Sequence, residues 1–105
     1  MLTLDTKPTF TAEIDVPTTT EGKKAIRVTF NYKTQDQWRD YVKDNFSGDK
    51  LLLDILADDL IVSWERVSLP FSKDNLQQLS NVHGSLLNTL LQAYIDGLNK
   101  GKLGN

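Results

Sequence analysis

The densest apolar stretch of the chain runs from Leu51 to Leu79, and the rest of the sequence is organised around it. Within it, apolar residues recur at positions 52, 55, 56, 60 and 64, which is the three-and-four spacing of one helix face. The run Leu60-Ile61-Val62 is equally typical of a short buried strand. We expect a helix between Lys50 and Val67, with a strand over Leu60 to Glu65 as the alternative.

Two segments with a different periodicity precede this stretch. Apolar and polar residues alternate from Thr9 to Val16, and the alternation resumes from Lys23 to Tyr32 after a turn-forming segment at 17–22. A period of two is that of a half-buried strand, so the pair predicts an antiparallel hairpin. Because an isolated hairpin is only marginally stable, its apolar face should lie against helices. That face carries Phe10, Ile14, Val28 and Phe30.

Three further segments have helical signals. Thr34 and Gln37 have capping-box spacing, and the apolar residues that follow should meet the hairpin face; they are Trp38, Tyr41, Val42 and Phe46. Ser72 can cap a short helix. From Ser85 onward a leucine-rich stripe predicts a long helix, and the small residues at its border, Ala93 and Gly97, would let another backbone come close. We therefore predict one α+β domain over residues 1–105, with an N-terminal β-hairpin packed against a small bundle of about four α-helices.

Charge and composition argue against several classes of protein. Twelve basic and fourteen acidic residues give a formal charge of −2, and no window collects enough bases to bind nucleic acid. The chain has no Cys, which rules out disulfides and thiolate metal sites. No apolar run approaches the roughly 20 residues of a membrane span, and the first residues lack a signal-peptide pattern. We expect a cytoplasmic protein without nucleic-acid or membrane partners.

The sequence offers little catalytic chemistry. Its one histidine, His83, lies beside Gly84 in an expected loop and has no obvious Asp or Ser partner. Asp54, Asp58 and Asp59 would lie close together on a helix, where carboxylates can bind a divalent cation or act as acid and base. Solvated aspartates explain the same pattern, since no His or second acidic cluster accompanies them. We expect no catalytic residue, no metal site and no cofactor.

The order of these segments resembles the tail assembly chaperones of long-tailed bacteriophages and prophages. The matching features are a hairpin at 9–32, a helix at 34–46, an aliphatic segment at 51–67 ending in Trp-Glu-Arg-Val, a Pro-Phe-Ser helix start at 70–72, and a long helix from Ser85 to Lys102 before Gly104-Asn105. Two departures stand out. Arg66 occupies a position at which the family usually has Gly, and the acidic-Gly pair expected before the Pro-Phe segment is absent.

The resemblance implies a function without catalysis. Such chaperones bind the tape measure protein and keep it soluble while tail tube subunits polymerise around it, and they leave before the virion is complete. It also implies the tail tube protein, a longer form made by ribosomal frameshifting and a second copy of the chain as further partners. Two alternatives compete: a structural tail component such as a tube or connector subunit, and a prophage-encoded inhibitor of a host protein, which the small net charge disfavours.

A chaperone for an apolar helical client needs apolar surface beyond its own core. The long C-terminal helix has the widest stripe, and Leu87, Leu91 and Ile95 lie toward one edge of it. The segment that departs from the family pattern offers a second surface, at Trp64, Leu69 and Phe71. These six residues are the predicted partner-binding residues.

Overall fold

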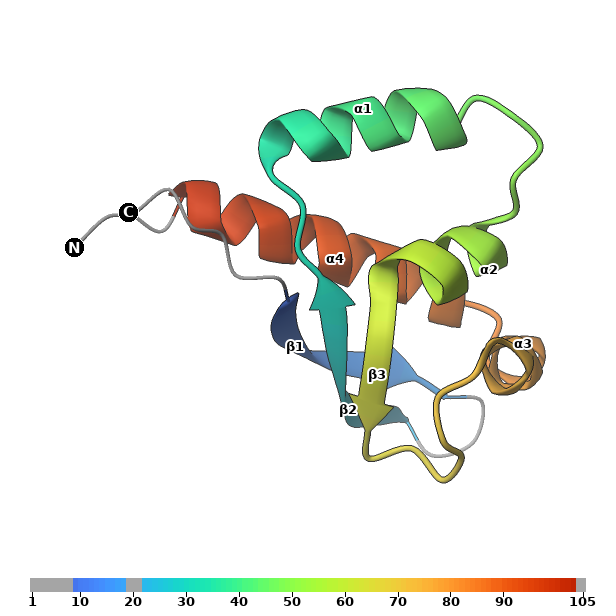
Figure 1. Cartoon of the computed structure of the whole chain (residues 1–105). Coiled ribbons are helices and arrows are strands. Elements are labelled where there is room, and N and C mark those ends of the chain that lie inside the picture. Colours follow the sequence, from blue (N-terminus) through green and yellow to red (C-terminus); the bar gives the residue numbers. More distant parts are fainter. Residues whose placement is uncertain (1–8, 19–21, 104–105) are drawn as a thin grey trace.

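The computed structural model describes residues 9–18 and 22–103. It has a three-stranded antiparallel sheet with helices packed around it (Figure 1). The strand order is β1-β2-β3. Along the chain the elements are β1 (Thr9–Pro17), β2 (Lys23–Asn31), α1 (Gln35–Asn45), α2 (Leu52–Asp54), the π-helical turn η1 (Ile55–Leu60), β3 (Ile61–Glu65), α3 (Lys73–Val82) and α4 (Leu86–Leu103). The predicted α+β class is confirmed. The terminal motif Gly104-Asn105 and the expected extended start at 1–8 lie outside the described residues.

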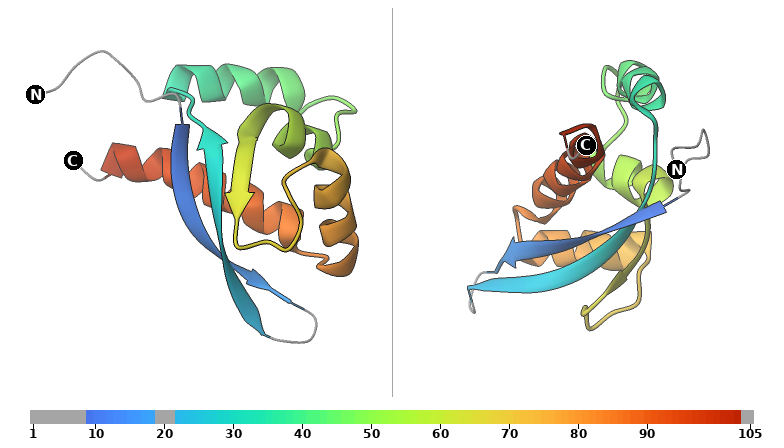
Figure 2. Two further views of the ribbon diagram at one scale, coloured as in Figure 1. Left: turned by 60° about the horizontal axis from the view of Figure 1, so that its bottom comes forward. Right: turned by 90° about the vertical axis from the view of Figure 1, so that its left-hand side faces the viewer.

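The predicted hairpin is present in β1 and β2. Its register places Phe10 opposite Phe30 and Ile14 opposite Ile26, so the apolar residues of the two strands share one face. Ile14 and Val28 are buried on that face, whereas Glu13 and Arg27 form an ion pair on the opposite one, with 2.9 Å between Arg27 Nη2 and Glu13 Oε1. Figure 2 shows α4 running across the strands, α3 beside β3 and α1 beyond the ends of the strands.

The preferred helix over residues 61–65 is wrong, and the alternative strand is present as β3. β3 pairs with β2 through Thr29 opposite Ser63 and Phe30 opposite Ile61, which leaves Val62 as a bulge. The bulge turns Ile61 and Trp64 toward the same side, and both are buried, whereas Val62 is 45% exposed. Buried residues three apart are the spacing of a helix, so the bulge imitates a helical pattern in the sequence.

The turn after β3 keeps a conformation suited to glycine without containing one. Arg66 has a φ of 66°, in the left-handed region that glycine adopts most easily. This is the position at which the resemblance predicts Gly. The Trp64 indole N–H then donates to the Leu69 carbonyl oxygen at 2.7 Å and closes the loop. Arg66 therefore has a backbone conformation that is strained for a residue with a Cβ atom.

Helix α1 is held by aromatic side chains rather than by deep burial. Its capping box is confirmed: the Gln37 N–H donates to Thr34 Oγ1 at 3.2 Å, and the Thr34 N–H donates to Gln37 Oε1 at 2.9 Å. No residue of α1 is buried. The expected packing of α1 on the hairpin differs in detail, because Tyr94 of α4 lies between them, with ring centroids 5.1 Å from Trp38 and 5.2 Å from Phe30.

Helix α4 crosses the apolar face of the sheet and completes the core. Leu86, Leu90 and Tyr94 recur every four residues and are buried, and the Tyr94 hydroxyl donates to the Asn31 carbonyl oxygen at 2.9 Å. Gly97 admits the ring of Phe10: a Cβ atom at Gly97 would lie 2.9 Å from Phe10 Cζ. The close approach expected at this small residue is thus made within the chain, by an aromatic ring of β1.

Candidate binding groove

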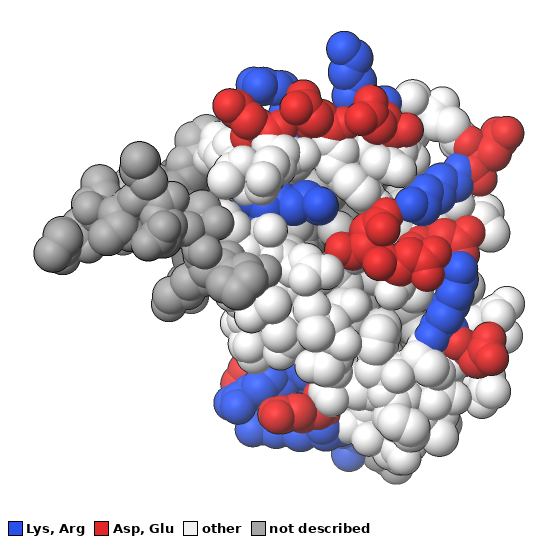
Figure 3. Space-filling model, in the orientation of Figure 1, with Lys and Arg blue, Asp and Glu red and all other residues white. Residues whose placement is uncertain are grey.

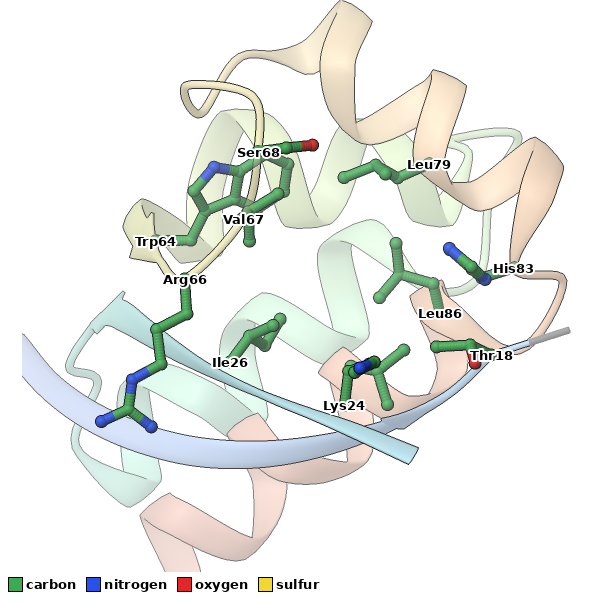
Figure 4. A pocket seen from close by; sticks show the side chains of 11 residues that line it. Thr18, Lys24, Ile26, Trp64, Arg66, Val67, Ser68, Leu79, His83 and Leu86 are labelled. Carbon is green, nitrogen blue, oxygen red and sulfur yellow. The ribbon is translucent and has the colours of Figure 1, made fainter. Parts of the chain in front are cut away.

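An apolar groove of about 380 Å³ opens between the far end of the β1–β2 hairpin, the loop after β3 and the junction of α3 with α4 (Figure 4). Eleven residues line it: Val16, Thr18, Lys24, Ile26, Trp64, Arg66, Val67, Ser68, Leu79, His83 and Leu86. Because they come from the sheet, the loop and both C-terminal helices, only the assembled fold creates this surface.

The floor of the groove consists of core side chains. Val16 and Ile26 are 5% and 8% exposed, Leu86 is 3% exposed, and Trp64 is 9% exposed. Leu79 and Val67 are half-buried against the same core. A floor that also stabilises the fold is held in place by packing on its inner side, so it presents a preformed apolar surface.

The edge of the groove is polar and carries basic groups. Lys24 and Arg66 line it, and none of the eleven residues is Asp or Glu. The nearest carboxylate partner of Arg66 in the described residues is Glu13, with 3.8 Å between Nη2 and Oε1. Both side chains of that pair are more than half exposed, so solvent screens their attraction. The groove thus combines an apolar floor with a positive edge in a chain of net negative charge.

His83 lines the groove, and its side chain also carries a buried polar atom without a partner. Its backbone N–H ends α3 by donating to the Leu79 carbonyl oxygen at 2.8 Å. The side-chain Nδ1 atom is buried, and within the part of the chain that the structure describes it has no hydrogen-bond partner. A buried polar atom without a partner destabilises the fold.

Three of the predicted partner-binding residues come together beside the groove. The rings of Trp64 and Phe71 meet edge to face, with centroids 5.1 Å apart, and Leu69 accepts the indole hydrogen bond described above. Trp64 itself lines the groove, whereas Leu69 and Phe71 do not. The Leu69 carbonyl group and the Phe71 ring therefore hold the loop against Trp64.

The other three predicted residues lie along α4 and outside the groove. Leu87, Leu91 and Ile95 are all half-buried. Leu87 and Leu91 pack against the buried core, so much of their apolar surface is already used within the chain. The structure does not bring this row of side chains together with Trp64, Leu69 and Phe71 into one surface.

Most of the residues that line the groove were not predicted from the sequence to be binding residues. Val16 and Ile26 lie in segments predicted only as strands, and Leu79 and Leu86 lie in segments predicted only as helices. Two signals were available: Arg66 at an expected glycine position, and the break around His83 between the last two helices. Both mark the loops that shape the walls, but neither could locate the hairpin end that faces them.

Lysines pair with the aspartate cluster. Lys73 Nζ lies 2.6 Å from Asp54 Oδ1 and 3.2 Å from Asp58 Oδ2, and Lys50 Nζ lies 2.6 Å from Asp59 Oδ2. Figure 3 shows acidic and basic side chains interleaved over α1 and over the α2–η1 region. In residues 9–18 and 22–103 no group of three or more His, Cys, Asp or Glu side chains is arranged to hold a metal ion. The cluster has a structural role, because the ion pairs of Lys73 connect α3 with α2 and η1.

Asp59 is also bound from α1. The Tyr41 hydroxyl donates to Asp59 Oδ2 at 2.5 Å, alongside Lys50. Burial raises the pKa of Asp59, but the hydrogen bonds from Lys50 and Tyr41 and the positive charges of Lys50 and Lys33 together outweigh burial and leave this pKa below its ordinary value. Burial, followed by the bond to Asp59, raises the pKa of Tyr41. The carboxylate therefore fastens α1 to η1 as an ion.

The chain was compared with known protein families, curated proteins and solved structures. A family model described as phage tail assembly chaperone matches residues 1–105. Neither a curated protein nor a solved structure matches the chain. Among the described residues, no helix is both long enough and apolar enough to cross a membrane.

Proposed function

The chain belongs to the phage tail assembly chaperone family, and from this premise we propose that it binds the tape measure protein and keeps it soluble while the tail tube assembles. It acts in the cytoplasm of the bacterial host, without catalysis, and it is absent from the finished virion. The observation that carries the proposal is the family match, which spans the whole chain from residue 1 to residue 105.

The physical need for such a chaperone follows from the client. A long, apolar-rich helical protein aggregates unless its apolar stripes are covered, and a partner that offers a matching apolar surface prevents this. The preformed groove at Trp64 and Leu86 offers such a surface. Leu51, Val62 and Val82 add exposed apolar side chains, at 64%, 45% and 57% exposure.

The absence of catalysis is part of the proposal and has a chemical basis. Asp54, Asp58 and Asp59 are each within 3.2 Å of a lysine ammonium group, so none is placed as a free base or as part of a carboxylate pair. His83 has no Asp, Ser or Cys partner among the described residues that would make it part of a nucleophilic site.

Further partners belong to the same proposal. The tail tube protein, a longer frameshifted form of the chain and a second copy of the chain are the candidates that the family membership suggests. Each would be met during assembly, when several copies of the chaperone line the extended client. A complex of the tape measure protein with the chaperone should therefore contain more than one chaperone copy.

Co-expression with the tape measure protein of the same genome tests the proposal. We expect the soluble fraction of the tape measure protein to rise several-fold over expression alone. Tyr94→Ala serves as the control, because truncation of this fully buried ring costs about 3–5 kcal/mol and should unfold much of the chain. A tape measure protein that is equally insoluble with the parent chain, or equally soluble with Tyr94→Ala, would refute the proposal.

A further inference from the structure

We propose that the groove between the hairpin end and the α3–α4 junction holds the client, and that its occupant is an amphipathic helix with apolar anchor side chains flanked by acidic residues. This inference rests on the proposed function and adds the binding site and the chemistry of the bound segment. It moves the site away from Leu87, Leu91 and Ile95, since none of them lines the groove.

The size and lining of the groove fit the anchor side chains of a helix. Its volume of about 380 Å³ is near the lower end of the roughly 300–1,000 Å³ typical of ligand pockets. This volume can hold a few large side chains, but not the surface of a folded domain. A helix presents such side chains at i, i+3 and i+4, and the floor of Ile26, Trp64 and Leu86 is apolar enough to receive them.

A helix also suits the groove better than an extended segment does. A helix satisfies its own backbone hydrogen bonds, whereas an added strand needs a row of free backbone groups on a sheet edge. β3 pairs with β2 only as far as Arg27, so the β2 edge beside the groove is short, and Lys23 and Lys24 lie on it. Lysines on a strand edge oppose the addition of another strand.

The charges around the groove favour acidic residues beside the apolar anchors of the bound helix. Of the described residues that line the groove, Lys24 and Arg66 are basic and none is acidic, although acidic residues outnumber basic ones in the chain as a whole. An acidic flank would therefore meet complementary charge, and a basic flank would meet like charge.

The two tryptophans of the chain allow a test without any substitution. Trp64 lines the groove, whereas Trp38 lies on α1 and does not. The probe is a designed amphipathic peptide of about five helical turns with a leucine stripe and glutamate flanks. In a titration followed by indole N–H NMR signals, the Trp64 signal should shift while the Trp38 signal stays in place. A shift of Trp38 alone, or of neither, would overturn the inference.

Two matched peptides test the chemistry of the occupant. One replaces the flanking glutamates with lysines, and the other keeps the glutamates but carries a central proline that breaks the helix. Each should bind about tenfold more weakly than the parent peptide in fluorescence anisotropy. Equal or tighter binding of the lysine peptide would contradict the charge argument, and equal binding of the proline peptide would show that an extended segment occupies the groove instead.

A filled groove supplies the third test. Ser68 is exposed and lines the groove, so Ser68→Trp should block it, whereas Ser47→Trp places the same ring in an exposed loop after α1. We expect at least tenfold weaker peptide binding for Ser68→Trp and an unchanged affinity for Ser47→Trp. Equal affinity of the two variants would refute the groove as the site.

The inference and the proposed function can fail separately. If the tape measure protein stays soluble with both the parent chain and a folded Ser68→Trp variant, the groove is refuted as the binding site and the proposed chaperone function is supported. If the parent chain does not keep the tape measure protein soluble, the proposed function falls whatever the peptides do. Loss of solubility with Ser68→Trp alone supports both.

Discussion

Substitution of Gly97 by alanine should have opposite effects on stability in the presence and absence of the Phe10 ring. In the parent chain the new Cβ atom would lie 2.9 Å from Phe10 Cζ and 3.2 Å from Cδ2, well inside normal contact. The ring has little room to move, because it also packs against Phe30 and Tyr94 with centroids 5.4 and 5.5 Å away. Overpacking of this kind costs about 1–3 kcal/mol.

Alanine also favours the helix itself. It is better than glycine in a helix interior by about 1 kcal/mol, so Gly97→Ala alone should lower the free energy of unfolding by up to about 2 kcal/mol. In a Phe10→Ala background the clash is gone and only the helical gain remains, so the same substitution should raise the free energy of unfolding by about 1 kcal/mol.

Urea unfolding of the four chains in this cycle, followed by circular dichroism, measures both effects and their coupling. We expect a coupling energy of about 1–3 kcal/mol between the two positions. If Gly97→Ala changes stability by the same amount in both backgrounds, the ring of Phe10 does not pack on Gly97 and the described contact of β1 with α4 is refuted.

Three further predictions concern the turn after β3 and helix α1. Arg66→Gly should raise the free energy of unfolding by about 1 kcal/mol in urea, because it relieves the left-handed φ of 66°, whereas Arg66→Ala should give no such gain. Trp38→Ala should cost about 2–3 kcal/mol in the same assay, less than a fully buried tryptophan, since Trp38 is only partly buried; a loss below about 1 kcal/mol would place its ring on the surface. The depressed pKa of Asp59 stabilises the fold above the ordinary pKa of about 4, and this contribution should disappear as the pH falls between about pH 5 and pH 3. Tyr41→Phe removes one of the bonds that lower this pKa, so unfolding should depend less on pH in that range, and an unchanged dependence would contradict the Tyr41–Asp59 contact.

The parts of the fold that were predictable have a simple local period. Alternation gave the two strands of the hairpin and the residues of its buried face, including Ile14 and Val28. The capping box at Thr34 and the helix start at Ser72 were also predictable, because each is satisfied by hydrogen bonds within the first turn.

The parts that were not predictable depend on contacts between distant segments. The bulge at Val62 gives β3 a helix-like spacing, and only its pairing with β2 distinguishes the two structures. The position of Tyr94 between Trp38 and Phe30 depends on how α4 crosses the sheet. Both features depend on tertiary packing, which the spacing of residues along the sequence does not specify.

The groove could not be predicted for the same reason. Its floor is built from residues that serve the core, so each looked structural when considered alone. Two local signals were available, Arg66 in the β3–α3 loop and the break around His83 between α3 and α4. A binding surface made from several core elements becomes visible only once the elements are assembled.

The most direct test of the chaperone account compares two fractions from one infection by quantitative mass spectrometry: complexes isolated before tail assembly is complete, and purified phage particles. The account predicts that the chain copurifies with the tape measure protein in the first fraction and is absent from the second. Presence of the chain in the particles, in a fixed ratio to the tail tube subunits, would contradict it and would identify a structural tail component instead.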